Sequence, residues 1–191
     1  MNINGNGFIA KNLRKIIIPK KFFIYAAGVS NSSSKNKKFF KRELNQFKNY
    51  LKKIKTNNVI IYISSTTLGN KSLKNIQYVK NKLKIEKIIQ RQIKNYIIIR
   101  LPQIVGKNNN KYTLTNFIFN CFKKNKELAL WENSIRNIID IEDLIKIIEK
   151  YLNNKPKINL IKNDTIFKIY NKNLILNENK KKKFFIFLVI F

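Results

Sequence analysis

Two neighbouring stretches decide the fold: Asn58-Val-Ile-Ile-Tyr-Ile-Ser-Ser-Thr-Thr67 and, shortly after it, Gln77-Tyr78-Val-Lys-Asn-Lys82. Residues 59–63 are a continuous apolar run rich in β-branched side chains, which is typical of a central parallel strand covered on both faces. Tyr78 and Lys82 are four residues apart in a segment that predicts a helix, so both side chains project from one face. The sequence therefore predicts strand-end hydroxyls beside a Tyr/Lys pair, a set of groups that can move a proton during hydride transfer.

The Tyr-x-x-x-Lys spacing is weak evidence by itself, because the chain is so rich in lysine that the spacing recurs at Tyr151 and Lys155. Only Tyr78 and Lys82 follow a strand that ends in hydroxyl residues and precede a long amphipathic run. An ordinary packed tyrosine beside a solvated lysine is the alternative interpretation. Position in the predicted fold, not the spacing, singles out the first pair.

The composition sets limits on the class of protein. With 191 residues and 44% hydrophobic side chains, the chain can bury the core of one domain. The formal net charge of +30 would suit nucleic acid or an anionic membrane. However, the basic residues are scattered and the chain is saturated with Lys, Asn and Ile, as the product of an A/T-rich coding region would be. We favour that origin over a dedicated nucleic-acid surface.

Cysteine and histidine usage points to a reducing compartment without zinc. The single cysteine, Cys121, lies in an apolar helical stretch, so we expect it to fill the core rather than to react. With no histidine and one cysteine, a zinc site is excluded, and we predict no metal. The beginning of the chain has no basic-then-apolar signal sequence, and no apolar run approaches the ~20 residues of a membrane span. The expected location is cytoplasmic.

Along the chain, predicted strands and helices alternate. A glycine turn in residues 1–14 opens a helix, and Phe22-Phe-Ile-Tyr-Ala-Ala-Gly28 is a strand that ends in small residues. A helix is expected over 39–54, a strand over 95–106 that Pro102 interrupts, a helix over 113–122, a short strand over 127–131 and a helix over 144–152. This alternation predicts a parallel α/β sheet. We expect the core to cover residues 1–157 and the divergent basic and aromatic segment 158–191 to lie outside it.

Six short motifs occur in one order. They are Gly5-Asn-Gly-Phe-Ile-Ala10, Phe23-Ile-Tyr-Ala-Ala-Gly28, Tyr62-Ile-Ser-Ser-Thr-Thr67, Tyr78-Val-Lys-Asn-Lys82, Arg100-Leu-Pro-Gln-Ile-Val-Gly106 and Arg136-Asn-Ile-Ile-Asp-Ile-Glu-Asp-Leu144. In this order they resemble the extended short-chain dehydrogenase/reductase superfamily, in its nucleotide-sugar epimerase/dehydratase branch. The chain looks most like short members linked to bacterial surface polysaccharides. The resemblance implies a Rossmann-like parallel sheet flanked by helices.

The resemblance also implies roles for individual residues. Tyr78 would be the acid/base, Lys82 would supply a positive charge and hold the nicotinamide ribose, and Ser65 would orient the reacting hydroxyl. The expected cofactor contacts are Asn4, Gly5, Gly7, Phe8, Ile9, Ala26, Ala27, Gly28, Ser64, Tyr78, Lys82 and Pro102. The expected substrate contacts are Ser65, Thr66, Asn116 and Arg136, where the arginine fork suits a diphosphate. Ser64 or Thr66 would replace Ser65 if the alignment slips by one residue.

The implied cofactor is NAD or NADP, and the implied substrate is a nucleotide-linked sugar that is epimerised, dehydrated or reduced. A homodimer is one assembly to expect, and we predict neither a nucleic-acid partner nor a membrane span. Two other interpretations stay open: a non-catalytic or degraded member that keeps the fold, and a basic nucleic-acid-binding protein, for which the sequence has no recognition motif.

Three departures from the family pattern bear on activity. The strand–helix–strand segment between the glycine turn and the second motif is nearly absent. The acidic residue that the family pattern places on the adenosine ribose is missing too. The C-terminal substrate lobe is largely missing as well. Residues 179–191, Asn-Lys-Lys-Lys-Lys-Phe-Phe-Ile-Phe-Leu-Val-Ile-Phe, fit either a shifted reading frame or a segment that touches a membrane surface.

Overall fold

The computed structural model describes residues 2–110, 113–127, 137–153 and 166–168. Within these residues, five parallel strands form the main sheet in the order β1-β2-β3-β4-β7. They are β1 (Ile3–Asn4), β2 (Phe22–Tyr25), β3 (Val59–Ser65), β4 (Tyr96–Leu101) and β7 (Ile166–Lys168). A separate parallel pair joins β5 (Gln103–Val105) to β6 (Ile138–Asp140). The predicted α/β class with a parallel, Rossmann-like sheet is confirmed.

The central strand is β3, because it pairs with β2 on one side and with β4 on the other. Its residues Val59 to Ile63 are all buried, as the unbroken apolar run predicts. Successive side chains point to opposite faces of a strand. Accordingly, Ile61 and Ile63 belong to the apolar core on one face, whereas Tyr62 belongs to the core on the other.

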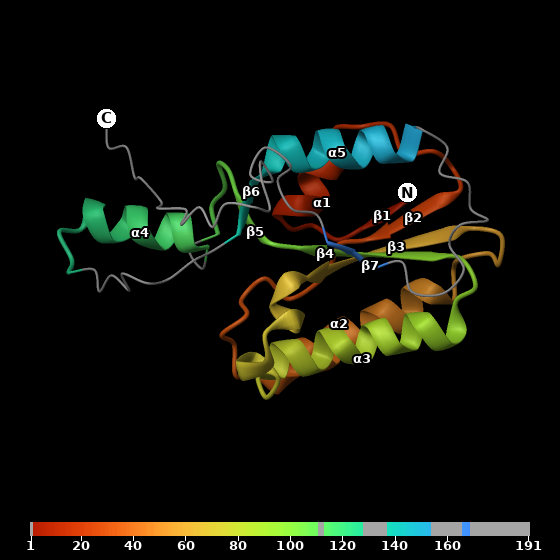
Figure 1. Cartoon of the computed structure of the whole chain (residues 1–191), viewed down its shortest axis with the longest axis horizontal. Helices are drawn as coiled ribbons and strands as arrows, with labels where there is room; N and C mark the ends of the chain where they lie inside the picture. Colours follow the sequence, from red (N-terminus) through yellow and green to blue (C-terminus); the bar gives the residue numbers. More distant parts are fainter. Residues whose placement is uncertain (1, 111–112, 128–136, 154–165, 169–191) are drawn as a thin grey trace, which may run out of the picture.

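Helices cover both faces of the sheet (Figure 1). The bounds are α1 (Phe8–Leu13), α2 (Lys37–Leu51), α3 (Gln77–Gln92), α4 (Leu114–Lys123) and α5 (Ile141–Asn153), with short 3₁₀ helices η1 (Thr66–Gly69) and η2 (Lys71–Leu73). Helices α1 and α5 lie on one face, and α2 and α3 lie on the other (Figure 1). Leu13, Leu144 and Ile148 pack in the first core; Phe47 and Ile85 pack in the second.

Asparagine and threonine side chains begin two of the helices. Asn36 accepts a hydrogen bond from the backbone N–H of Lys38 at the start of α2. Thr113 caps α4 by accepting from the N–H of Asn116. Such caps satisfy N–H groups that the first helical turn leaves without partners. Because Asn36 is the cap, helix α2 starts two residues before the predicted 39–54 span. It ends three residues before the predicted end.

The predicted strand over 95–106 is two strands that belong to different sheets. Pro102 has no N–H and separates β4 in the main sheet from β5, which pairs with β6. Helix α5 begins three residues before the predicted 144–152 span. Four residues of the strand predicted over 127–131 lie outside the described residues.

Two further sequence-based expectations concern the end of the chain and membranes. Residues 166–168 pair with β4, so part of the segment expected to lie outside the core adds a strand to the sheet. The boundary after residue 157 stays a prediction. Among the described residues, no helix has both the length and the apolar character that a bilayer crossing requires.

We predict that Ile61→Ala lowers the free energy of unfolding by about 2–5 kcal/mol, because it leaves a cavity in a close-packed core. Ile61 is 1% exposed and lies in the middle of β3. Urea unfolding followed by circular dichroism measures the change. The matched control is Ile17→Ala, at a side chain that is 85% exposed, which should shift stability by about 0.5 kcal/mol or less. Equal losses in the two variants would contradict the assignment of β3 as the central buried strand.

Candidate functional site

The candidate site lies where β2 and β3 end. Because the strands are parallel, their carboxyl ends meet at one edge of the sheet, which is where open α/β sheets bind ligands. Ala26 to Gly28 follow β2, and Ser64 and Ser65 end β3. Helix α3 brings Tyr78 and Lys82 from its first turns to the same region.

The structure brings Tyr78 and Lys82 together. The Lys82 ammonium nitrogen lies 5.8 Å from the centre of the Tyr78 ring and 4.9 Å from the centre of the Tyr62 ring. Tyr78 is half-buried, whereas Lys82 is buried, with only 4% of its side chain exposed. The ammonium therefore lies beneath the tyrosine, between α3 and the sheet. The pairing follows from the i,i+4 spacing on α3.

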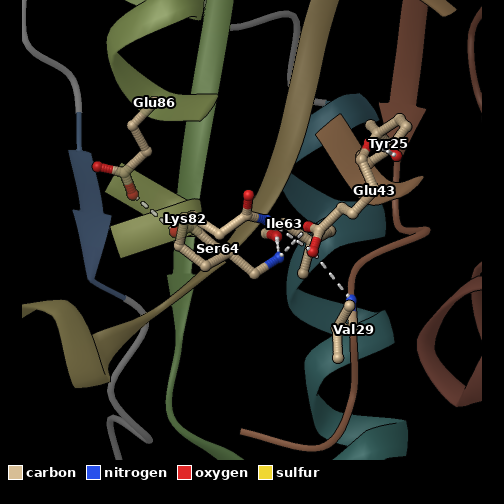
Figure 2. Close-up of polar contacts among 8 residues, drawn as sticks. Tyr25, Val29, Glu43, Ile63, Ser64, Lys82 and Glu86 are labelled. Atoms are coloured by element: carbon tan, nitrogen blue, oxygen red, sulfur yellow. Dashed lines mark hydrogen bonds and ion pairs between the residues drawn. The ribbon is translucent and has the colours of Figure 1, made fainter. Parts of the chain in front are cut away.

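An acidic residue that the sequence analysis missed holds this lysine. Glu43 on α2 forms an ion pair with Lys82 through Oε1 at 3.1 Å, and the lysine also donates to the carbonyl oxygen of Ile63 at 3.3 Å. Figure 2 shows the ammonium between the carboxylate and the Ile63 carbonyl. The other oxygen of Glu43 accepts from Asn81 at 3.1 Å and from the backbone N–H of Val29 at 3.2 Å.

A signal for Glu43 was present in the sequence. Glu43 is three residues after Phe40 and four before Phe47, and these two define the apolar stripe of α2. An acid at that spacing lies on the buried face, and buried acids are almost always paired. Glu43 is 2% exposed. The sequence analysis predicted a helix over 39–54 but did not consider this acid.

The charge on Lys82 depends on this neighbourhood. Burial alone would lower the pKa of Lys82, but its interactions with Tyr62 and with the Glu43 carboxylate outweigh burial, and the pKa is raised above its usual range. The Tyr62 hydroxyl itself has no hydrogen-bond partner in the described part of the chain. Lys82 therefore stays an ammonium ion at neutral pH.

The strand-end serines both form hydrogen bonds with other side chains of the described residues. Ser65 donates to the Thr67 hydroxyl at 2.9 Å and accepts from the Thr67 N–H, which starts η1. Ser64 is buried and donates to Glu86 Oε1 at 2.6 Å, and Glu86 also pairs with Arg100 at 2.6 Å. Thr66 is half-buried in η1. Their roles in binding stay predictions.

In the glycine turn, the backbone of Gly5 lies close to the backbone of Ala26. Gly5 has φ +129°, and a Cβ there would collide with the carbonyl oxygen of Ala26, so the turn lies directly against the end of β2. Gly7 precedes α1 with open space where its Cβ would be. The Arg14 side chain donates back to the Gly5 carbonyl and supports the turn.

The remaining predicted contacts are dispersed. Phe8 and Ile9 pack against the apolar core between the sheet and α5, and Pro102 is buried at the end of β4. The Asn116 amide donates to Asn108 and Asn110, so it fixes the loop after β5. Asn4 pairs with Tyr25 across β1 and β2. Arg136 lies outside the described residues.

A pocket of about 390 Å³ lies elsewhere, between α2 and α3. Its lining comprises Lys37, Lys38, Phe40, Lys41, Leu44, Gln77, Lys80, Asn81 and Lys84. None of the residues predicted from the sequence to bind cofactor or substrate is in this lining. A cleft for a dinucleotide at the carboxyl edge stays a prediction.

Comparisons with known proteins agree with this architecture. UDP-glucuronic acid 4-epimerase from Bacillus cereus, solved with NAD, superposes with a TM-score of 0.60 at 17% identity, covering 87% of this chain and 57% of the other. The capsular polysaccharide assembling protein CapF from Staphylococcus aureus has a TM-score of 0.56 at 17% identity, covering 86% of this chain and 50% of the other. The dTDP-glucose 4,6-dehydratase DesIV from Streptomyces venezuelae has a TM-score of 0.54 at 12% identity, covering 75% of this chain and 51% of the other. These likenesses show the fold.

The chain spans about half the length of these solved proteins. No curated protein sequence matches it. The model of the NAD dependent epimerase/dehydratase family matches residues 19–162, well over half of the chain. This match, on a parallel sheet that carries the glycine turn and the Tyr78/Lys82 pair, shows that the chain belongs to the NAD dependent epimerase/dehydratase family.

Proposed function

We propose that the chain is an NAD-dependent enzyme that acts on a nucleotide-linked sugar by epimerisation, dehydration or reduction. The observation that carries this proposal is the Lys82 ammonium held 5.8 Å from the centre of the Tyr78 ring, near the carboxyl end of the central strand. The family match and the nucleotide-sugar enzymes among the structural neighbours support it. The individual sugar and the reaction type are left open.

The cofactor of this family is NAD, and the nicotinamide side of the site fits it. Gly7 leaves open space at the start of α1, where a pyrophosphate can approach, and the small residues Ala26 and Ala27 follow β2 beside the glycine turn. Lys82 would hold the nicotinamide ribose. When bound, NAD accepts a hydride from a carbon of the sugar.

The adenosine side fits less well. Residues 14–21 are all described and contain no strand, so β1 is the edge of the sheet in the described part of the chain. The sequence analysis expected this loss of the strand–helix–strand segment. The described residues therefore offer contacts for the phosphates and the nicotinamide ribose but few for the adenosine.

Tyr78 would transfer the proton. A free phenol ionises near pH 10, and a neighbouring positive charge favours the phenolate. Lys82 supplies that charge, because its ion pair with the Glu43 carboxylate favours the protonated ammonium form. Tyr78 would then take the proton from a sugar hydroxyl as the hydride leaves the same carbon. Ser65 and Thr66 would orient that hydroxyl once Ser65 turns away from Thr67, and Arg136 would bind the diphosphate.

A non-catalytic member that keeps the fold is the second candidate. The sheet of the described residues, which ends at β1 without the adenosine-side strand, favours it. A role in bacterial surface polysaccharide synthesis is a further proposal, supported by the likeness to CapF. A cytoplasmic location and a homodimer remain proposals of the same kind.

We predict that the purified chain binds NADH, measured by the change in nicotinamide fluorescence, and turns over a member of a panel of UDP-, GDP- and dTDP-sugars. Tyr78→Phe should keep NADH binding but lower kcat by about 10²–10⁴-fold, the usual contribution of a general acid or base. Tyr151→Phe is the control, because Tyr151 has the same spacing to a lysine but lies on α5. Wild-type protein that binds NADH but transforms no sugar would favour the non-catalytic member.

We predict that Gly28→Ala weakens NADH binding and lowers the free energy of unfolding by about 1–3 kcal/mol, the usual effect of overpacking. A Cβ at Gly28 would collide with Lys82 Nζ and lie 3.2 Å from Glu43 Oε1, so it would displace the ammonium from its ion pair. Gly69→Ala is the matched control, since a Cβ there meets nothing within 4 Å. Thermal unfolding and NADH titration of both variants test this, and unchanged Gly28→Ala protein would contradict the close contact.

A further inference from the structure

Glu43 connects three separate parts of the candidate site. Its two oxygens accept from Lys82 and Asn81 on α3 and from the N–H of Val29, the residue after Gly28. Its backbone carbonyl accepts from the Tyr25 hydroxyl at 3.1 Å. Figure 2 shows the carboxylate between the lysine and the loop after β2. One side chain thus fixes both the lysine and the segment expected to lie against the nicotinamide.

We infer that Glu43 is a positioning residue for this enzyme: it fixes the place and the charge of Lys82 and joins both to the loop at Val29. This inference rests on the proposed role of Lys82 toward the cofactor. Glu43 is 2% exposed and lies under the lysine, so it acts through Lys82 and the loop rather than through contact with substrate.

The energetic argument begins with burial. A buried ammonium without a partner loses its proton readily, because low-polarity surroundings penalise the charged form. Lys82 has one carboxylate partner, at 3.1 Å. The other groups that face this pair are the phenols of Tyr25, Tyr62 and Tyr78, with Arg42 near Tyr25. Among the described residues, Glu43 is therefore the carboxylate that favours the protonated form of Lys82, at 3.1 Å from its nitrogen.

Geometry gives the second part of the argument. Lysine has a long flexible side chain, and its ammonium donates in any direction. In this structure two acceptors on different elements, Glu43 on α2 and the Ile63 carbonyl on β3, hold the ammonium beneath Tyr78. Loss of the carboxylate would leave the Ile63 carbonyl as its hydrogen-bond partner among the described residues. The ammonium would then be free to leave its place under the tyrosine.

The scarcity of acids strengthens the inference. The chain has 10 acidic and 40 basic residues, so an acid at a random position would find cations at the surface. Glu43 is instead buried in a helix whose other charged side chains are basic and exposed. A carboxylate in that place carries a desolvation cost, which the contact with Lys82 offsets.

The test compares Glu43→Gln with Glu86→Gln in the full-length chain. Glu86 is the matched control because it is equally buried and ion-paired, but to Arg100 rather than to Lys82. The first readout is the ¹⁵N NMR signal of the Lys82 side chain, assigned with Lys82→Met and followed as the pH is raised. In the wild type and in Glu86→Gln, Lys82 should stay protonated until the protein unfolds. In Glu43→Gln it should lose its proton at a lower pH.

NADH titration is the second readout. Glu43→Gln should bind NADH about tenfold more weakly, equivalent to one lost charge-assisted contact, and Glu86→Gln should bind as the wild type does. Glu43→Asp retains the charge but has a shorter reach, so its Lys82 signal should shift while the lysine stays protonated. If Glu43→Gln does not fold, Glu43→Asp carries the test through that shift.

The inference is wrong if the Lys82 signal titrates identically in Glu43→Gln and the wild type, or if Glu86→Gln alters it equally. Failure of the proposed function looks different. In that case wild-type protein binds no NADH, although the NMR signal of Lys82 still depends on Glu43. The two outcomes are therefore separable in one set of samples.

Discussion

The structure depends on the burial of β3 on both faces. Val59 to Ile63 can satisfy their backbone groups only by pairing with strands on each side, and β2 and β4 provide that pairing. The helices then cover the two faces, α1 and α5 on one and α2 and α3 on the other (Figure 1). Because all the strands of this sheet are parallel, the residues after β1, β2 and β3 meet at one edge. The candidate site is a consequence of that constraint.

Much of this arrangement could be predicted from the sequence, because burial on both faces leaves a continuous apolar run. The run at 59–63 and the first part of the strand predicted over 95–106 correspond to β3 and β4. The i,i+4 spacing placed Tyr78 and Lys82 on one face of α3. The small residues 26–28 indicated a strand end against which a cofactor could lie, and that role stays a prediction; in the structure Lys82 lies against Gly28. These features are local, so a pattern of neighbouring residues was enough.

The rest depended on contacts between distant residues, which no local pattern specifies. Lys82 and Glu43 are separated by 39 positions, and Ser64 and Glu86 by 22. The sequence analysis assigned Ser64 to the cofactor, which stays a prediction, and did not foresee that its hydroxyl donates to Glu86. It could not foresee that Pro102 would send β5 to a different sheet, since a proline ends a strand without indicating the next partner.

Both buried glutamates are ion-paired with a basic side chain. Glu43 pairs with Lys82 and Glu86 pairs with Arg100, and both acids lie on the α2/α3 side near the end of β3. Removing one partner of a buried pair commonly costs about 3–5 kcal/mol, whereas an apolar pair of similar volume would be as stable or more so. Stability alone therefore does not explain them. In a chain of net charge +30, the positions of the few carboxylates indicate a functional site better than the positions of the many lysines do. Of the two, it is Glu43 that contacts Lys82, and an oriented, protonated lysine has a chemical use in the candidate site.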